Sequence, residues 1–180
     1  MAVAVVLVTT GDGGSGGGSG GVGPAAPGQV RVTGGPHDGL LSPGEEIPLF
    51  SAPEMNGGRV SWTQYEGTPT VLAVRAPWCP HCQVELPVLA RVAADFPGVE
   101  LVSVATQINA RPGPTVDGYM RDNGLTFQVA LDDARGTLGA ALGISVFPTV
   151  YYVNSQGVVE QATEGEVDEA TLRSLLGSLA

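Results

Sequence analysis

Residues 78–87 read WCPHCQVELP, a stretch that contains both cysteines of the 180-residue chain, Cys79 and Cys82. Residues 70–74 before it form a short apolar run of strand length, and after it apolar residues recur about every 3.6 positions, as in a helix. Pro80 suits the first helical turn, where its missing N–H costs no hydrogen bond. The sequence therefore predicts a strand and a helix joined at Cys79, with Cys82 within one turn of it and able to form a disulfide with it.

The two sulfur atoms are expected to lie in different environments. Unpaired N–H groups and the helix dipole favour an anion at a helix N-terminus, so the pKa of Cys79 should be lowered. At helical spacing, one inward face contains Cys82, Glu85, Leu89, Val92 and Phe96. Burial should raise the pKa of the Glu85 carboxyl and suit it to exchange a proton with the second sulfur. We therefore predict Cys79 as the exposed attacking thiol and Cys82 as the sheltered resolving thiol.

The run from Trp78 to Pro87 resembles the active-site signature of TlpA-like (ResA-like) extracytoplasmic thioredoxins. It has the tryptophan, the CxxC, an acid three residues on and a proline two residues after the acid. Residues 143–149, GISVFPT, resemble the segment that carries the thioredoxin family's cis-proline, so Pro148 is expected to follow a cis peptide bond. The resemblance covers residues 40–180. It implies a single α/β domain with the thioredoxin fold, a central mixed sheet flanked by helices.

The resemblance implies an extracytoplasmic thiol-disulfide oxidoreductase that works without metal or organic cofactor. Its partners would be cysteine-containing client proteins, among them those of cytochrome maturation, and a protein that resets the dithiol. In this family the cis-proline loop packs against the CxxC and offers its backbone to the client. Trp78 is expected to shield the disulfide and to present surface to the client, with core packing as the alternative. Phe147 is expected either to line the client groove beside Pro148 or to fill the core. We further expect the protein to be a monomer.

Two positions depart from the family pattern and leave the direction of electron flow open. Ala73 stands where cytoplasmic thioredoxins have a buried aspartate, and the central pair Pro80-His81 is similar to that of DsbA-type oxidants. Hydrogen bonding or positive charge from His81 would stabilise the Cys79 thiolate, which only the reduced form carries. We therefore predict a reduction potential less negative than the about −270 mV of thioredoxin.

Other function classes find less support in the residues. A peroxiredoxin-type thiol peroxidase shares the fold, and a non-catalytic binding module with a structural disulfide is a further alternative. Cys79, His81 and Cys82 supply too few ligands for an ordinary zinc site, so no metal is expected. The net charge of −10, with no basic stripe, argues against nucleic acid. The chain has no lysine, which excludes Schiff-base chemistry on a lysine.

Residues 1–39 are interpreted as an apolar N-terminus followed by a disordered tether, and residues 40–180 as the thioredoxin-like domain. Met1–Val8 is apolar but shorter than the about 18 residues that span a bilayer, which suggests a truncated signal or anchor. The Gly/Ser-rich segment Gly11–Gly21 cannot form a core. The expected location is the bacterial cell envelope, with the protein either tethered to the membrane or secreted.

The remaining pattern of the domain alternates between strands and helices. Strands are predicted at 59–62 (an edge strand), 99–106 and 127–131, with a hairpin at 149–153 and 158–163. Helices are predicted at 115–123, 137–142 and from Asp168 onward. Arg75 is expected at the surface end of its strand, with a contribution to positive potential at the site as the alternative. Asp132 and Asp133 are expected to be a solvated loop pair, and His37 an exposed loop residue.

Overall fold

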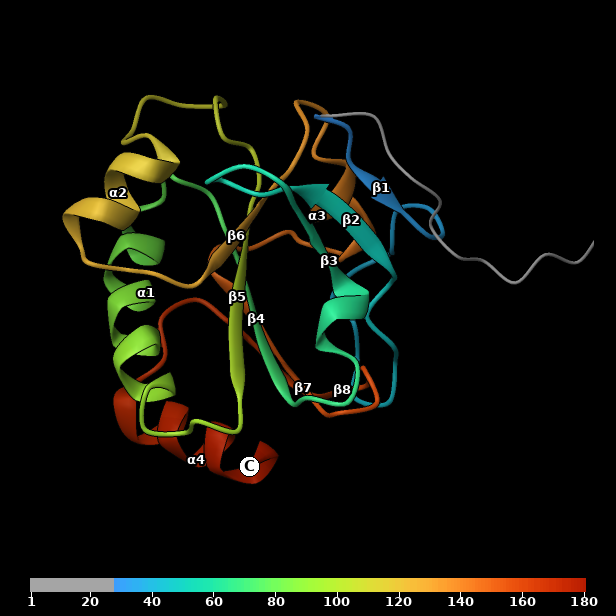
Figure 1. Cartoon of the computed structure of the whole chain (residues 1–180), viewed down its shortest axis with the longest axis vertical. Coiled ribbons are helices and arrows are strands. Elements are labelled where there is room, and N and C mark those ends of the chain that lie inside the picture. The colour runs from blue at the N-terminus through green and yellow to red at the C-terminus, as the bar shows by residue number, and fades with distance from the viewer. Residues whose placement is uncertain (1–27) are drawn as a thin grey trace, which may run out of the picture.

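A five-stranded mixed sheet forms the centre of the structure, a computed structural model that describes residues 28–180 (Figure 1). Its strand order is β6-β5-β4-β7-β8. Strands β4 (Thr70–Arg75), β5 (Glu100–Ala105) and β6 (Gln128–Leu131) are parallel to one another. Strand β7 (Thr149–Val153) pairs antiparallel with β4, and β8 (Val159–Glu164) pairs antiparallel with β7. The predicted apolar run Met1–Val8 and tether Gly11–Gly21 lie outside the described residues.

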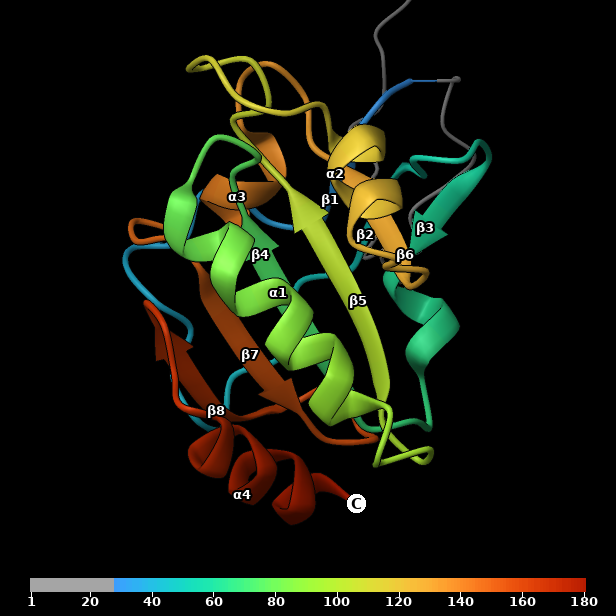
Figure 2. The same ribbon diagram turned by 90° about the vertical axis from the view of Figure 1, so that its left-hand side faces the viewer.

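Both faces of this sheet are covered. Helices α1 (Pro80–Ala93), α2 (Val116–Asp122) and α4 (Glu169–Leu179) lie on one face, and Figure 2 shows α1 running in front of the strands. On the other face lie α3 (Thr137–Ala141) and a second, antiparallel sheet of order β1-β2-β3. This small sheet consists of β1 (Arg31–Val32), β2 (Phe50–Pro53) and β3 (Arg59–Ser61), and the 3-10 helix η1 (Trp62–Tyr65) follows it.

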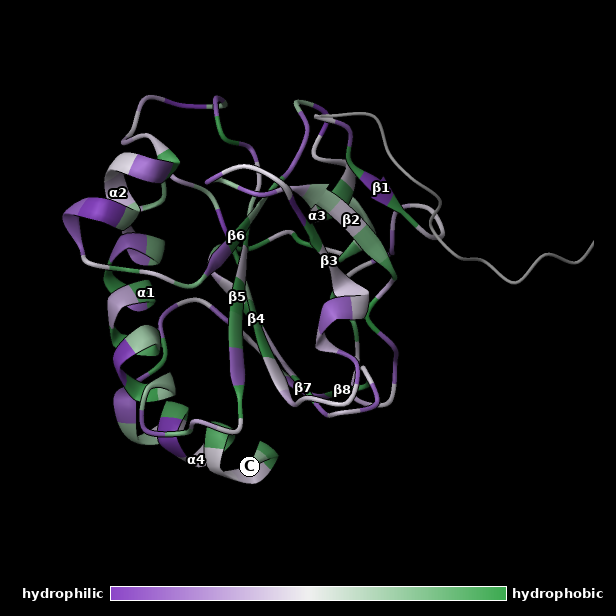
Figure 3. Cartoon of the chain, in the orientation of Figure 1, coloured by the Kyte–Doolittle hydropathy of each residue, from purple (hydrophilic) through white to green (hydrophobic). Residues whose placement is uncertain are grey.

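The side chains of β4 alternate between two hydrophobic clusters, as the period of a strand requires. Val71 and Ala73 face the cluster beneath α1, α2 and α4, whereas Leu72 and Val74 face the cluster beneath the small sheet. Figure 3 accordingly shows apolar residues concentrated along the central strands. Strand β4 therefore joins the two halves of the core, and its last residue, Arg75, leads directly into the segment that carries Cys79.

The predicted mixed sheet with helices on its faces is confirmed, and the predicted elements lie within two residues of the observed ones. The predicted edge strand is β3, although it belongs to the small sheet and Trp62 starts η1. Strands β1 and β2 are not predicted by the sequence. Because β1 precedes residue 40, the small sheet includes residues that the sequence analysis placed in the tether. Within residues 28–180, no helix has the length and apolar character needed to cross a membrane.

Candidate active site

Cys79 caps the N-terminus of α1. Its backbone is extended (φ −79°, ψ 116°), and its Sγ accepts a hydrogen bond from the Cys82 N–H at 3.3 Å. Pro80 occupies the start of the helix, as predicted, where no intrahelical donor is needed. The sulfur thus takes the place that an oxygen of serine or aspartate usually has at a helix N-cap. This arrangement places the first sulfur against the unpaired N–H groups of the helix.

The two cysteines are free thiols at the centre of a small cluster formed with Ala76, Trp78 and Phe147. Only 4% of Cys79 and 2% of Cys82 are accessible to solvent. The prediction of a sheltered Cys82 is confirmed, but that of an exposed Cys79 is wrong. Cys79 is covered because its thiol lies against the loop before β7, where it donates to the Phe147 carbonyl at 3.8 Å.

This loop contains the predicted cis peptide bond, between Phe147 and Pro148. Hydrogen bonds hold it on both sides: the Gly165 N–H donates to the Pro148 carbonyl, and the Thr149 hydroxyl donates to the Val146 carbonyl, each at 2.8 Å. The loop is therefore anchored to β8 and to β7. It brings together the two halves of the sequence that carry the resemblance, the CxxC and the cis-proline segment.

Trp78 is held in place by contacts from several directions. Its indole Nε1 donates to the Gln107 carbonyl at 2.9 Å, and its ring meets Phe147 edge to face at 5.8 Å and 86°. The Arg111 guanidinium lies 4.4 Å from the indole centroid, within the range of a cation–π interaction. Gly113 approaches so closely that a Cβ there would lie 2.7 Å from the Trp78 Cα. The loop of residues 107–114, which the sequence analysis did not single out, thus fixes Trp78 beside the sulfurs.

The environment of Cys82 disfavours its thiolate. Burial raises the pKa of the Cys82 thiol, and the hydrogen bond and charge of Cys79 raise it further. The backbone of Ala76 and the charge of Arg75 act in the opposite direction. Cys82 is therefore protonated at neutral pH and must lose its proton before it can attack a disulfide.

Glu85 points into the protein, as predicted, and only 3% of it is exposed. Its Oε2 accepts a hydrogen bond from the Val167 N–H at 3.2 Å, whereas Oε1 is buried without a partner. Burial raises the pKa of Glu85, the Val167 hydrogen bond lowers it, and the nearby charge of Glu166 raises it. Within the described part of the chain, no hydrogen bond joins Glu85 to Cys82, although both belong to the buried face of α1.

His81 lies at the surface end of the site. Its ring is largely exposed, and Nδ1 lies 2.5 Å from Oε1 of Glu166, in the loop between β8 and α4. His81 was expected to act on the Cys79 sulfur, but no hydrogen bond between these two residues occurs in residues 28–180. The partner of His81 was not predictable, since Glu166 is distant in the sequence and one of many acidic residues.

Arg75 and Asp132 are buried, and the predictions that placed them at the surface are wrong. Arg75 continues the alternation of Val71 and Ala73 and therefore points to the side of α1 and α2. This alternation in the sequence could have indicated that Arg75 points toward the helices. Asp132 accepts hydrogen bonds from the Thr106 hydroxyl and from the Leu138 and Gly139 N–H groups, at 2.7–2.9 Å. The carboxylate is thus satisfied by protein instead of water.

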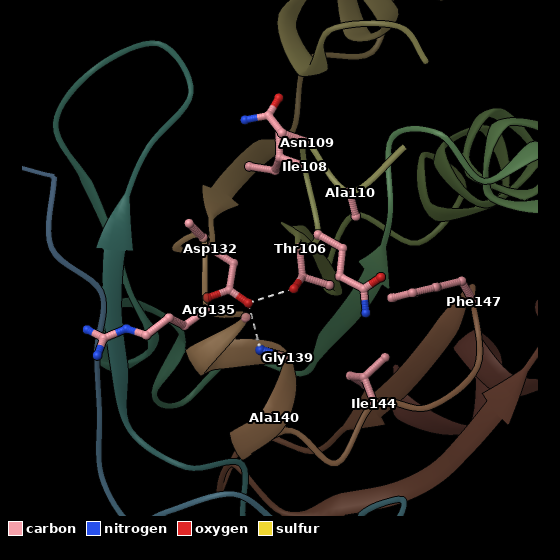
Figure 4. Close-up of a pocket in the computed structure, with 13 residues that line it drawn as sticks. Thr106, Ile108, Asn109, Ala110, Asp132, Arg135, Gly139, Ala140, Ile144 and Phe147 are labelled. Carbon is pink, nitrogen blue, oxygen red and sulfur yellow. Dashed lines mark hydrogen bonds between the residues drawn. The ribbon is translucent and has the colours of Figure 1, made fainter. Parts of the chain in front are cut away.

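Asp132 belongs to the wall of a cavity of about 560 Å³ that reaches Phe147. Figure 4 shows its carboxylate between Thr106 and Gly139 and hydrogen-bonded to both. Asp133, predicted to be solvated, is partly buried and accepts from the Arg135 and Thr137 N–H groups at 3.0 Å. The Asp132 carboxylate in the wall of this cavity is therefore already bonded to protein groups.

His37 lies in a loop, as predicted, but is partly buried and bonded to the Gly39 carbonyl and to Glu45. No group of three or more histidine, cysteine or acidic side chains that could hold a metal ion occurs among residues 28–180. The chemistry that the arrangement supports is that of the thiols themselves. One sulfur at a helix N-terminus and a second one turn further on can form and break a disulfide with another thiol.

Comparison with known proteins supports this interpretation. The chain is 28% identical over 138 residues to the thiol:disulfide interchange protein DsbE of Pseudomonas aeruginosa, covering 76% of this chain and 74% of that protein. It is likewise 28% identical over 138 residues to the thiol-disulfide oxidoreductase ResA of Bacillus subtilis, covering 76% and 75%. A solved structure of a secreted disulfide oxidoreductase of Mycobacterium tuberculosis aligns with a TM-score of 0.64 at 25% identity, over 72% of this chain and 96% of that one.

These relatives confirm both the thioredoxin fold and the resemblance to ResA-like proteins that the CxxC stretch indicates. Residues 43–162 match the AhpC/TSA family. The matched segment contains the CxxC, the cis-proline loop and all five strands of the central sheet except the last two residues of β8. Since it spans more than half of the sequence, the chain belongs to the AhpC/TSA family.

Proposed function

We propose that this protein is an extracytoplasmic thiol-disulfide oxidoreductase that exchanges electrons with cysteine-containing client proteins through Cys79 and Cys82. The observation that carries the proposal is the position of Cys79. Its sulfur caps α1, accepts the Cys82 N–H at 3.3 Å and lies against the carbonyl of the cis-proline loop. A structural disulfide would need none of these contacts, whereas a nucleophilic sulfur gains from the helix N-terminus.

In the reducing direction, the Cys79 thiolate attacks one sulfur of a client disulfide. A bond forms between Cys79 and the client, and the other client sulfur leaves as a thiolate that takes up a proton. Cys82 loses its proton and attacks the Cys79 sulfur, so that the Cys79–Cys82 disulfide forms and the second client sulfur leaves. The client gains the electron pair that the dithiol loses. In the oxidising direction the same steps run backwards, and in either case a second redox partner must restore the starting state.

Glu85 is the proposed acceptor of the Cys82 proton. It lies one helical turn from Cys82 on the buried face of α1, and its Oε1 has no partner. Because burial raises its pKa, the Glu85 carboxylate takes up a proton more readily than an exposed carboxylate does.

Trp78 and Phe147, which lie beside the buried Pro148, form the proposed contact surface for the client. The indole and phenyl rings pack with the sulfurs, and two apolar side chains near them in the sequence, Val84 and Val146, are exposed to 56% and 42%. Val84 follows the CxxC in α1, and Val146 precedes the cis-proline loop. Exposed apolar side chains of this size favour contact with an extended, partly apolar client segment.

Trapping of mixed disulfides tests the proposal. A Cys82→Ser variant can form the bond to the client but cannot resolve it, so client proteins should accumulate on Cys79 and be released by dithiothreitol. The matched Cys79→Ser variant should trap none, and both variants should lose turnover of insulin disulfides. Client binding that survives replacement of both cysteines would indicate a binding module instead. Rapid peroxide consumption by Cys82→Ser would indicate a thiol peroxidase.

The proposed location outside the cytoplasm is supported by the relatives, one of which is described as secreted. We propose that the protein acts as a monomer, either secreted or held at the cell envelope by the Gly/Ser-rich segment that precedes the domain. Cell fractionation with an antibody to the folded domain tests this. Recovery of the protein in the cytoplasmic fraction would contradict it.

A further inference from the structure

Arg75 is a buried cation without a counterion. Only 2% of the residue is exposed, and its Nε and Nη2 atoms are buried without hydrogen-bond partners. None of the ion pairs among residues 28–180 includes it. A guanidinium stays charged at neutral pH, and a buried, unpaired charge destabilises the folded state. The fold keeps this cation at a cost in stability that its packing does not explain.

The groups around Arg75 show what it acts on. Its guanidinium carbon lies 5.6 Å from the centroid of the Tyr119 ring, whose hydroxyl donates to the Gln83 carbonyl of α1 at 2.7 Å. Burial lowers the pKa of Arg75, and the opposing charges are those of Tyr119 and Cys82. Conversely, Cys82 interacts with Cys79 from its own helix, with Arg75 from β4 and with Tyr119 from α2. The Glu85 carboxyl also lies on the buried face of α1, one helical turn from Cys82, but it makes no hydrogen bond to Cys82 within residues 28–180.

An aromatic ring offsets part of the cost of a buried cation, but it does not replace an anion. The one group beside Arg75 that becomes an anion during disulfide exchange is Cys82. A fixed charge placed where negative charge develops stabilises that state strongly, because it needs no rearrangement during the reaction. In the resting dithiol Cys82 is a thiol, so the cation has an opposite charge to meet only during the resolving step.

We propose that Arg75 is an electrostatic positioning residue that stabilises the Cys82 thiolate during resolution of the mixed disulfide. The inference rests on the proposed function and assigns a role in it to a residue outside the CxxC. In this step Cys82 gives up its proton and its thiolate attacks the Cys79 sulfur. The Cys79–Cys82 bond forms, the bond between Cys79 and the client breaks, and the client sulfur leaves with the electron pair. In the reverse direction, Arg75 stabilises Cys82 as the leaving group.

The two steps can be observed separately with Ellman's reagent (DTNB) and reduced full-length protein. Attack by Cys79 releases one thionitrobenzoate and leaves the other bound to Cys79. Attack by Cys82 then releases the second and closes the disulfide. Each unit by which the pKa of Cys82 rises lowers its thiolate fraction about tenfold and raises thiolate nucleophilicity about threefold, so the second step slows about threefold.

In Arg75→Met we expect the second release to slow at least about threefold, with its pH profile displaced upward by about one unit or more. The first release should stay within about twofold of the wild type, because Arg75 acts on the other sulfur. Arg75→Gln is equally uncharged and should behave alike, so it replaces Arg75→Met if that variant does not fold. Arg59→Met is the matched control, since it removes an arginine from β3 of the small sheet and should change neither rate.

Distinct results would overturn the inference and the function on which it rests. An unchanged second release in both Arg75 variants, or equal slowing of both releases with no displacement of the pH profile, would overturn the role of Arg75. A wild-type protein that releases no second thionitrobenzoate would overturn the proposed function itself, because its cysteines would be unable to close a disulfide by this route.

Discussion

His81 Nδ1 lies 2.5 Å from Glu166 Oε1, so the histidine between the two cysteines is paired with the loop that precedes α4. The sequence alone presents His81 as an unopposed source of positive charge next to Cys79. In the structure a carboxylate stands beside it. The Glu166 charge also raises the pKa of Glu85, so this one acidic residue acts on both ends of the dithiol site.

Glu166→Gln should make the reduction potential less negative. Removal of the carboxylate takes a negative charge from the surroundings of the Cys79 thiolate, which stabilises the reduced form. Exposed ion pairs contribute up to about 1 kcal/mol, so the shift should be about 10–20 mV. Titration against glutathione measures it. Glu160→Gln in β8 is the control and should leave the potential unchanged, while a more negative potential for Glu166→Gln would contradict the expectation.

Glu85→Gln should change how stability depends on pH. Because burial raises the pKa of Glu85, the folded protein binds this proton over a pH range in which the unfolded chain has lost it. In that range, from about pH 4.3 upward to the raised pKa, the wild type loses stability as the pH rises. Glutamine does not titrate, so the variant should gain stability relative to the wild type across the range. Urea unfolding of the reduced proteins, at intervals of about one pH unit from about pH 4 to 8, checks this. Parallel curves of stability against pH for the two proteins would refute it.

The same variant should slow the resolving step. Loss of a general acid or base typically costs about 100-fold or more in rate. The second release of thionitrobenzoate should therefore slow strongly in Glu85→Gln, whereas the first release by Cys79 should change little. An unaltered second release would show that water alone accepts the Cys82 proton.

Asp132→Ala should destabilise the protein by about 2–4 kcal/mol. The substitution leaves the Thr106 hydroxyl and the N–H groups of Leu138 and Gly139 without their acceptor. Guanidinium unfolding monitored by circular dichroism measures the loss. Asp122→Ala, at an exposed position at the end of α2, should stay within about 0.5 kcal/mol of the wild type. Equal effects of the two substitutions would mean that the buried network contributes nothing.

Gly113→Ala should disturb the active site, whereas Gly98→Ala should not. A Cβ at Gly113 would lie 2.7 Å from the Trp78 Cα, so the backbone must move, while a Cβ at Gly98 meets nothing within 4 Å. We expect a loss of about 1–3 kcal/mol for Gly113→Ala. Thermal unfolding together with insulin turnover checks both. If Gly113→Ala kept full stability and turnover, the close approach of the loop to Trp78 would be unimportant.

The parts of this fold that the sequence predicts are those set by local rules. Helix α1 follows from Pro80 at its start and from apolar residues at helical spacing, and α4 follows from the Asp168 cap, which accepts the Thr171 N–H at 3.0 Å. The cis bond before Pro148 follows from the resemblance to a known family. Strands β1 and β2 lack such a signal. They are short, lie among glycines and prolines, and exist because residues 31–32 pair with residues 50–51.

The charge of a residue did not predict whether it is buried where tertiary contacts determine its burial. Arg75 was expected at the surface because charged residues are seldom buried. It is instead buried beneath the helices, where its guanidinium lies over the ring of Tyr119 from α2. Asp132 is likewise buried because Thr106 and the start of α3 supply its donors. Tyr119 and Thr106 are distant in the sequence from Arg75 and Asp132, so no local pattern identifies them as the partners. The closeness of the two thiols was predicted correctly, because both lie within one helical turn.

Trp78 and Trp62 are the only tryptophans of the chain. Trp62 is buried in the other hydrophobic cluster, stacked with Phe50, whereas Trp78 packs with the two sulfurs and is locked by the Gln107 carbonyl. Replacing Trp62 with phenylalanine leaves a single indole fluorophore beside the redox centre. Oxidation of the two sulfurs beside Trp78 alters how strongly the emission of this indole is quenched. The fluorescence of Trp78 therefore follows each turnover without an attached dye.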